Sequence, residues 1–230
     1  KVAQTYENYA TVQKYSSQKL VKYCQEHLNP NPKILDLGCG TGYIAKHFSK
    51  KNIQTFSCDL SLEMLTRNAF CDKKINCDFE NLPFKKESFD VLISSFSLQW
   101  IQNFQKSFAE FYEILKPNGI ICFCLPAQDS FNEIRKINPN ILNDLKDFEF
   151  YRNLLKKNNF NEIFCKKETL HEYFRNPIQA LKSFKNFGAN YKYQKNIDTA
   201  NNLFSLRDYK TADNSFSVSW EVGYFIFNKD

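Results

Sequence analysis

The sequence predicts an α/β fold in which helices cover both faces of a mostly parallel sheet. Short apolar runs alternate with amphipathic segments over the first 125 residues. A turn with three glycines directly follows the first apolar run, and the chain ends in a long segment of strict apolar–polar alternation. Strand–helix alternation is typical of parallel sheets, whereas period-two alternation predicts an extended terminal strand.

The first segment, Tyr6–Leu28, is predicted to be a helix that precedes the sheet and lies over its carboxyl edge. The strands that follow are short, rich in Ile, Val, Phe or Leu, and bounded by turn residues. They are expected at Ile34–Leu37, Ile53–Cys58, Val91–Ser95 and Ile120–Leu125, with a weaker strand at Lys74–Cys77.

Two of the intervening helices have recognisable ends. Ser61 is placed to cap a helix that carries Met64 and Leu65. A second helix has an apolar face, and Pro117 and Gly119 in "KPNG" are expected to end it before the next strand. This face comprises Phe104, Phe108, Phe111 and Leu115.

Beyond Leu125 the pattern changes. Residues 130–187 read as mostly helical, with a strand near Glu162–Phe174, and a polar linker follows around Asn190–Asn202. Apolar residues at alternate positions from Phe216 to Tyr224 then predict a long final strand.

Composition narrows the class of partner. The formal charge is +6 and the pI about 8.8, which favours an acidic partner or a solvated basic surface. No Lys/Arg block with interleaved aromatic residues occurs, so nucleic acid is not favoured. Eight cysteines form no C-x-x-C pair and three histidines have no metal-ligand spacing, so no metal site is expected. The sequence shows no signal peptide or membrane-length apolar run, and a reducing cytoplasm is the expected location.

The glycine turn suggests a cationic nucleoside as ligand. Gly38, Gly40 and Gly42 would allow the ligand to approach the backbone, next to the free N–H groups of the following helix. Asp36 precedes them, and a carboxylate repels a diphosphate but attracts a cation. Asp59, at the end of the second strand, is placed to accept ribose hydroxyl hydrogens, although an acid there also suits a helix cap.

The motifs "ILDLGCGTG", "CDLSLEML", "CDFENLPFKKESFDVLISS" and "LKPNGI" resemble those of class I S-adenosylmethionine-dependent methyltransferases over Ile34–Leu125. The resemblance implies a Rossmann-like three-layer sandwich with an antiparallel C-terminal strand and a helical lid. It implies one domain over 1–230, with a helical cap (1–30), a cofactor-binding core (31–127), a lid and substrate region (128–210) and the terminal strand (211–230). The implied cofactor is S-adenosylmethionine, and the implied cofactor-binding residues are Gln13, Asp36, Gly38, Gly40, Gly42, Asp59, Leu60, Met64, Asp78, Phe79 and Ser94. Met64 as an ordinary core residue is the alternative at that position.

The flanking segments resemble the malonyl-acyl-carrier-protein O-methyltransferases of biotin synthesis. "YENYATVQKYSSQKL", "SSFSLQW", "LKSFKNFGAN" and the aromatic final strand carry this resemblance. It implies methylation of the free carboxylate of a malonyl thioester carried by acyl carrier protein, with no membrane or nucleic-acid partner. A carboxylate is already ionised at pH 7, so no general base is expected.

The resemblance implies Tyr6, Gln99 and Trp100 as residues that orient the reaction, although Tyr6 and Trp100 also suit helix packing and core filling. Gln13 also suits an exposed helical position. Arg175 and Lys185 are candidates to bind the substrate carboxylate. An acidic carrier would suit a basic docking face formed by Lys156, Lys157, Lys166, Lys167, Arg175, Lys182 and Lys185. Another small-molecule acceptor, such as a quinone or another carboxylate, and a non-catalytic cofactor-binding scaffold remain alternative hypotheses.

Overall fold

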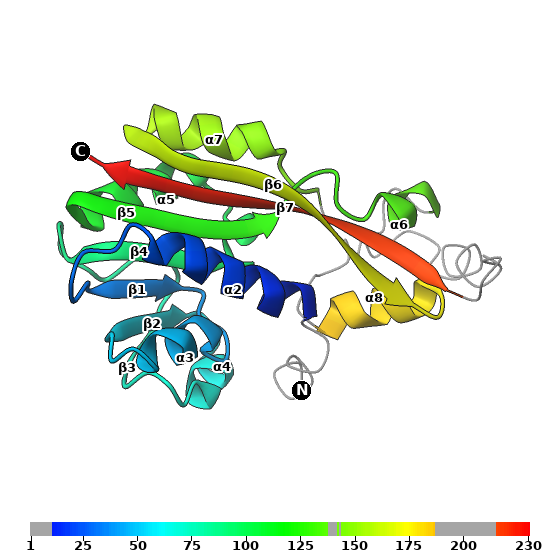
Figure 1. Cartoon of the computed structure of the whole chain (residues 1–230), viewed down its shortest axis with the longest axis horizontal. Helices are drawn as coiled ribbons and strands as arrows, with labels where there is room; N and C mark the ends of the chain where they lie inside the picture. Colours follow the sequence, from blue (N-terminus) through cyan, green and yellow to red (C-terminus); the bar gives the residue numbers. More distant parts are fainter. Residues whose placement is uncertain (1–10, 138–141, 143, 187–214) are drawn as a thin grey trace.

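A computed structural model describes residues 11–137, 142, 144–186 and 215–230. Seven strands form one sheet in the order β3-β2-β1-β4-β5-β7-β6 (Figure 1). Strand β7 lies antiparallel between β5 and β6, and the other neighbouring strands pair in parallel. The mostly parallel sheet with an antiparallel C-terminal strand is therefore confirmed.

Most strands lie close to their predicted positions, because buried apolar runs bounded by turn residues mark them clearly. Their bounds are β1 Ile34–Leu37, β2 Thr55–Asp59, β3 Lys73–Asn76, β4 Phe89–Ser95, β5 Leu115–Pro126, β6 Phe160–Phe174 and β7 Phe216–Lys229. Asp59 ends β2 as expected, whereas Asp78 lies two residues beyond the end of β3.

Side-chain caps define where several helices begin. Ser61, Asn103 and Asp147 each accept a hydrogen bond from the backbone N–H three residues later. The helices are α2 Thr11–Gln25, α3 Tyr43–Ser49, α4 Leu62–Arg67, the short 3-10 helix η1 Leu98–Trp100, α5 Phe104–Ile114, α6 Asn132–Ile137, α7 Phe148–Lys157 and α8 Pro177–Asn186. The part of the predicted first helix before residue 11 lies outside the described residues.

The apolar face predicted for α5 extended one residue too far. Leu115 was assigned to the apolar face of this helix, but it is extended and pairs with Phe89 as the first residue of β5. Pro117 disfavours a helical conformation at Lys116, so the helix has to end earlier. The register of β5 then shifts before Ile120 pairs with Val91.

The strand predicted near Glu162–Phe174 is confirmed as the 15-residue β6, which lies between the helices α7 and α8. β6 pairs only with β7 and forms one edge of the sheet. Charged residues such as Lys166, Glu168 and Glu172 alternate with Leu170 and Phe174 on one face, and this mixture weakens the period-two signal. The segment contributes α7 and β6 to the main layers as well as α6 and α8.

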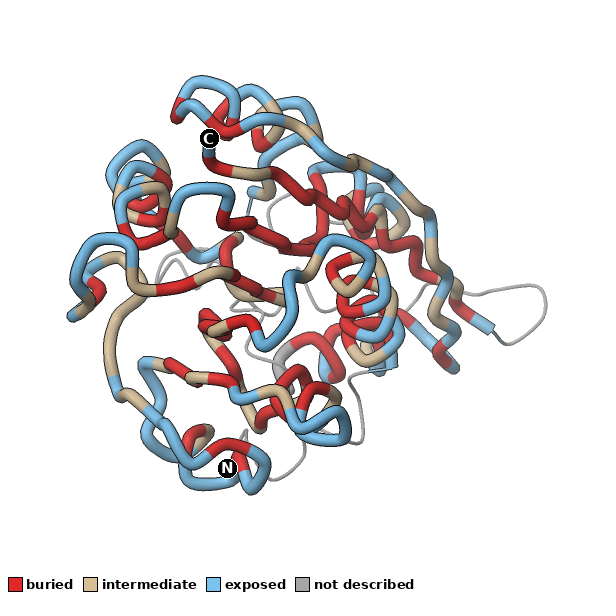
Figure 2. Tube along the Cα trace, turned by 60° about the vertical axis from the view of Figure 1, so that its left-hand side comes forward, coloured by how far each residue is buried: buried red, intermediate tan, exposed pale blue. Residues whose placement is uncertain are grey.

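The core consists of two apolar layers, one on each face of the sheet (Figure 2). Residues of α2 and α3 pack on one face, and residues of α5 and α7 pack on the other. On the α5–α7 face, the ring of Phe225 stacks between Phe123, with centroids 4.8 Å apart, and Phe148, at 4.7 Å.

Strands β6 and β7 continue past the end of β5 as a two-stranded ribbon. The last β5–β7 pair is Pro126 with Val222, but β6 and β7 remain paired as far as Phe174 and Phe216. We call residues 169–174 and 216–221 the β6–β7 ribbon. Figure 1 shows it extending from the end of the sheet at which β1 and β5 finish, with α6 and α8 beside it.

Helix α2 is fixed to this antiparallel pair just before the ribbon begins. Lys19 bonds to Glu168, which also accepts from the hydroxyl of Tyr224 at 3.3 Å. These contacts place the first turn of α2 at the carboxyl edge of the sheet (Figure 1). None of the described helices is long and apolar enough to cross a membrane.

Phe225→Ala should reduce the free energy of unfolding by about 3–5 kcal/mol, because it empties a fully buried position between two aromatic rings. Chemical denaturation monitored by circular dichroism measures this change. The matched control is Tyr173→Ala, which truncates an aromatic residue that is 70% exposed and should change stability little. Equal losses in both variants would contradict the packing described here.

Candidate active site

The candidate site lies at the carboxyl ends of β1 and β4. The chain passes from β1 to β2 and β3 on one side and then returns to β4 and β5 on the other. The crevice between β1 and β4 is therefore the topological switch point, where open α/β sheets bind ligands. The loops after these two strands touch, because the Ser97 hydroxyl donates to the Gly38 carbonyl at 2.9 Å.

The three glycines of the turn have left-handed backbones, with φ of 66°, 54° and 86° at Gly38, Gly40 and Gly42. A β-carbon at Gly38 would overlap Ser97, and one at Gly42 would overlap Asn68. At Gly40 nothing lies within 4 Å of the position that a β-carbon would take. The open side of the turn is thus at Gly40, where a ligand can reach the backbone.

Asp59 connects this turn to the next helix. Its Oδ2 accepts from the Gly40 N–H and its Oδ1 from the Ser61 N–H, both at 2.8 Å. The helix-cap alternative is therefore part of its role, although Ser61 caps α4 as well. Each carboxylate oxygen has a second acceptor site, so Asp59 retains the capacity to bind two ribose hydroxyls.

Asp36 is the most unusual polar group of the site. It is 1% exposed, and neither carboxylate oxygen has a hydrogen-bond partner in the described part of the chain. Burial raises the pKa of this carboxyl well above its usual range, and the nearby charge of Asp59 raises it further. A buried acceptor without a donor fits a cationic ligand group and is incompatible with a diphosphate.

The residues expected around the adenine lie around the same turn. The Phe79 ring is 3.6 Å from the β-carbon position of Gly38, and Asp78 accepts from the Glu80 N–H at 2.9 Å. Leu60 is 71% exposed, while Met64 is half-buried. An exposed leucine beside Asp59 leaves an apolar surface available for a planar ring.

Three predicted polar residues differ in their surroundings. The Ser94 hydroxyl is buried and donates to the Leu37 carbonyl at 2.8 Å, so it links β4 to β1. Gln13 is buried in the first turn of α2, and its Oε1 has no partner among the described residues. Gln99 donates to the Phe96 carbonyl at 2.8 Å, and its buried Oε1 likewise has no described partner.

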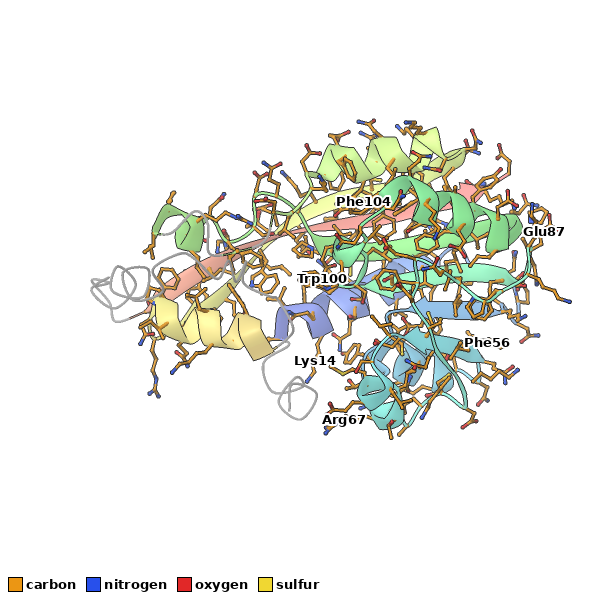
Figure 3. All side chains as sticks on the ribbon, turned by 180° about the vertical axis from the view of Figure 1, so that it is seen from behind. Lys14, Phe56, Arg67, Glu87, Trp100 and Phe104 are labelled. Carbon is orange, nitrogen blue, oxygen red and sulfur yellow. The ribbon has the colours of Figure 1, made fainter. Side chains whose placement is uncertain are left out.

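Trp100 is 37% exposed, so it is not core filler. A groove of about 430 Å³ beside it is also lined by Gln99, Phe104, Lys146 and Tyr151. In Figure 3, Trp100, Lys14 and Arg67 lie towards the end of the sheet from which the β6–β7 ribbon extends, whereas Phe56 and Glu87 lie towards the opposite end.

The ribbon contributes an aromatic cluster next to this edge. The Trp220 ring lies 5.9 Å from Phe96 and 4.6 Å from Phe131, measured between centroids. Both phenylalanines have left-handed backbones, with φ of 54° and 66°. Such strain in non-glycine residues persists only where the surroundings enforce it, and it often accompanies a functional site.

Other predicted residues lie apart or outside the described region. Tyr6 precedes the described residues, and the side chain of Lys185 lies outside them. The Gly188–Ala189 motif and the 190–202 linker also lie outside the described residues. Arg175 is exposed just after the last residue of β6, at the tip of the ribbon. It is therefore far along the ribbon from the glycine turn.

Sequence reasoning missed Asn68 and Ser97. Asn68 is buried, donates to the Ser57 hydroxyl at 3.1 Å and accepts from the Phe70 N–H at 3.1 Å, and it borders Gly42. Ser97 borders Gly38. Neither lies in a local pattern that marks its role, because the role arises from contact between separate loops.

No described histidine follows β1, β2 or β4 at this edge: His27 follows α2, His47 is in α3 and His171 is in β6. Burial, followed by Asp36 and Asp59, raises the pKa of the Cys39 thiol, so it stays protonated. All eight cysteines are free thiols. No group of three or more potential metal ligands occurs in the part of the chain that the structure describes.

Asp59→Ala should weaken S-adenosylhomocysteine binding by about 1–3 kcal/mol, because hydrogen bonds to the turn and to the ligand are lost together. Isothermal titration calorimetry measures the affinity. Asp72→Ala removes an exposed acid just before β3 and is the matched control. Unchanged affinity in Asp59→Ala would contradict the assignment.

Comparisons with known proteins agree with this geometry. A family model for a methyltransferase domain matches residues 35–123. The malonyl-[acyl-carrier protein] O-methyltransferase of Buchnera aphidicola subsp. Baizongia pistaciae is 31% identical over 202 residues, which cover 83% of this chain and 78% of that protein. The protein of the same name from Calditerrivibrio nitroreducens is 27% identical over 237 residues, covering 100% of this chain and 94% of its own length.

A crystal structure of a putative methyltransferase from Bacillus halodurans has the same fold, with a TM-score of 0.66 and 16% identity. The match covers 92% of this chain and 99% of that one. Together with the glycine turn, the two acids and the sheet order, these similarities define the family. The chain belongs to the class I S-adenosylmethionine-dependent methyltransferases, in the same family as the malonyl-[acyl-carrier protein] O-methyltransferases, and S-adenosylmethionine is its cofactor.

Proposed function

We propose that the protein transfers the methyl group of S-adenosylmethionine to the free carboxylate of a malonyl thioester on acyl carrier protein. The observation that carries this proposal is the similarity to enzymes of that name along most of the chain, with Gln99 and Trp100 at the carboxyl edge. The product would be a methyl ester, which hides a charge and lets a fatty-acid elongation system extend the chain towards biotin.

The chemistry of the described site supports an acceptor that is already ionised. The Cys39 thiol beside the glycine turn stays protonated, so it offers no general base to an alcohol, phenol or amine acceptor. A malonyl carboxylate needs no base. The sulfonium supplies an activated methyl group when bound, and the residues of this chain have to align the acceptor and exclude water.

In this proposal the cofactor site comprises Asp36 beside the cationic tail, the turn Gly38–Gly42, and Asp59 on the ribose. Leu60, Met64, Asp78 and Phe79 surround the adenine, and Gln13 closes the site from α2. Ser94 acts indirectly, because its hydroxyl is used between strands. Tyr6, Gln99 and Trp100 orient the acceptor.

The acceptor carboxylate needs a cation, and Lys146 is better placed for this than Arg175. It lines the groove beside Trp100, whereas Arg175 lies at the tip of the ribbon. Lys146 lies 5.3 Å from the centroid of the Phe150 ring and so is held over an aromatic face. We therefore assign the acceptor carboxylate to this groove.

The basic docking face has to be smaller than the seven residues suggested by the sequence. Lys156 bonds to Glu162, and Lys167 to Asp129. The set runs from the end of α7 along all of β6, a distance of about 45 Å for a 15-residue strand. Arg175 and Lys182 are the exposed members at the ribbon end, so they are the better candidates for contact with an acidic carrier.

The direct test is to incubate the protein with S-adenosylmethionine and malonyl-carrier protein, and then to weigh the carrier by mass spectrometry. A gain of one methyl group, absent with acetyl-carrier protein, is the expected result. Methylation of a free quinone or fatty acid in place of the carrier would contradict the proposed acceptor. Cofactor binding without any methylated acceptor would indicate a scaffold.

Trp100→Ala should lower kcat by on the order of tenfold or more while leaving S-adenosylhomocysteine affinity nearly unchanged, because it removes acceptor alignment. Steady-state kinetics and calorimetry separate the two effects. A loss of thermal stability as large as that of Phe225→Ala would instead indicate a structural role.

Lys146→Ala should raise the KM for malonyl-carrier protein by roughly 10–100-fold, as expected for a lost charged hydrogen bond. Lys157→Ala, at the exposed end of α7, is the matched control. Equal effects of the two variants would show that Lys146 acts only through general surface charge.

A further inference from the structure

Asp36 is buried in a way that an ionised carboxylate does not tolerate by itself. It is 1% exposed, and both oxygens lack hydrogen-bond donors among the described residues. Water and a cation are the usual partners of a carboxylate, and neither the solvent nor a described side chain supplies them here. An acid in such a position keeps its proton, because the charged form is poorly solvated.

The charged groups around Asp36 act in the same direction. The Asp59 carboxylate is the neighbouring charge that affects its pKa, and no described Lys, Arg or His offsets it. The Cys39 thiol also stays neutral, because burial and then the charges of Asp36 and Asp59 raise its pKa. The described charged group that affects the pKa of Asp36 therefore adds negative charge, and no described cation compensates for it.

We propose that Asp36 is a charge-selective switch, which holds a proton while the pocket is empty and releases it when a ligand with a positively charged tail binds. The O–H bond of the carboxyl breaks, the proton passes to the solvent, and the carboxylate pairs with the cation. The bound state then buries a charge pair instead of a lone charge. The switch depends on the cofactor and not on the methyl acceptor, so it can hold or fail independently of the proposed reaction.

The switch gives the pocket a preference that shape alone does not provide. A neutral nucleoside such as adenosine offers nothing to stabilise the carboxylate, so it binds with Asp36 still protonated. S-adenosylmethionine carries an ammonium and a sulfonium group against one carboxylate, and this net positive charge drives ionisation of Asp36. Its affinity should rise with pH by up to about tenfold per unit while Asp36 is protonated in the empty protein, and then level off.

Calorimetric titrations in two buffers with different ionisation enthalpies measure the protons released on binding. For the unaltered protein we expect S-adenosylmethionine to release close to one proton at pH values at which Asp36 is protonated in the empty protein. Fewer protons should be released as the pH rises above the pKa of Asp36 in the empty protein. Adenosine should release none. A heat of S-adenosylmethionine binding that is independent of the buffer across the range would overturn the proposal.

Asp36→Asn keeps the shape of the side chain and removes the titration, so its binding should release no proton from this site and its affinity should not vary with pH. Asp90→Asn is the matched control, because Asp90 lies at the opposite edge of the sheet and is bonded to Lys116 at 2.8 Å. Burial also raises the pKa of Glu172 to about 7, so proton release has to persist in Glu172→Gln. Equal release from Asp36→Asn and the unaltered protein would refute the assignment.

A second measurement covers the case in which Asp36→Asn binds too weakly to titrate. The pKa of Asp36 is raised in the folded state, so its stabilising contribution is full below the unfolded pKa and declines as pH rises through the folded value. Without ligand, the unaltered protein should therefore lose stability over that range relative to Asp36→Asn. Parallel stability curves for the two proteins would contradict a buried, protonated Asp36.

Discussion

The carboxyl of Asp36 lies near the end of the central strand β1, removed from water and from any described donor. The site depends on this unmet interaction. The sheet fixes its position, because β1 pairs with β2 on one side and β4 on the other. In our proposal, the burial of Asp36 without a donor lowers the stability of the empty protein, and a cationic ligand restores that stability when it binds. Part of the binding free energy is therefore available only to ligands that carry a positive charge.

The surrounding elements hold that interaction in place. Asp59 keeps the glycine turn against α4, while Ser97 keeps it against the loop after β4. Across the switch point, the ring of Trp220 in the β6–β7 ribbon contacts Phe96, which connects the ribbon to the loop after β4. Helix α2 is tied to β6 through Lys19 and Glu168, so its first turn lies over the site. A single sheet edge thus brings together segments that are far apart in the sequence.

Local patterns were sufficient to predict the parallel core, the final strand, and the positions of Asp36, the three glycines and Asp59. They failed where distant segments decide the structure. Leu115, for example, leaves the helix and pairs with Phe89 as the first residue of β5. The contacts of Asn68 and Ser97 with the glycine turn, and the position of Lys146 beside Trp100, depend on how separate loops meet, for which no sequence period exists. Trp100 could be assigned to the surface only when its exposure was known.

Infrared difference spectroscopy tests the protonation of Asp36 most directly, because the carbonyl stretch of a carboxylic acid is distinct from the stretches of a carboxylate. Spectra of the protein alone and with S-adenosylmethionine are compared, using Asp36→Asn to identify the band. The account predicts a protonated carboxyl band that disappears on binding and is missing from Asp36→Asn. An ionised Asp36 in the ligand-free protein, with no change when the ligand binds, would contradict it.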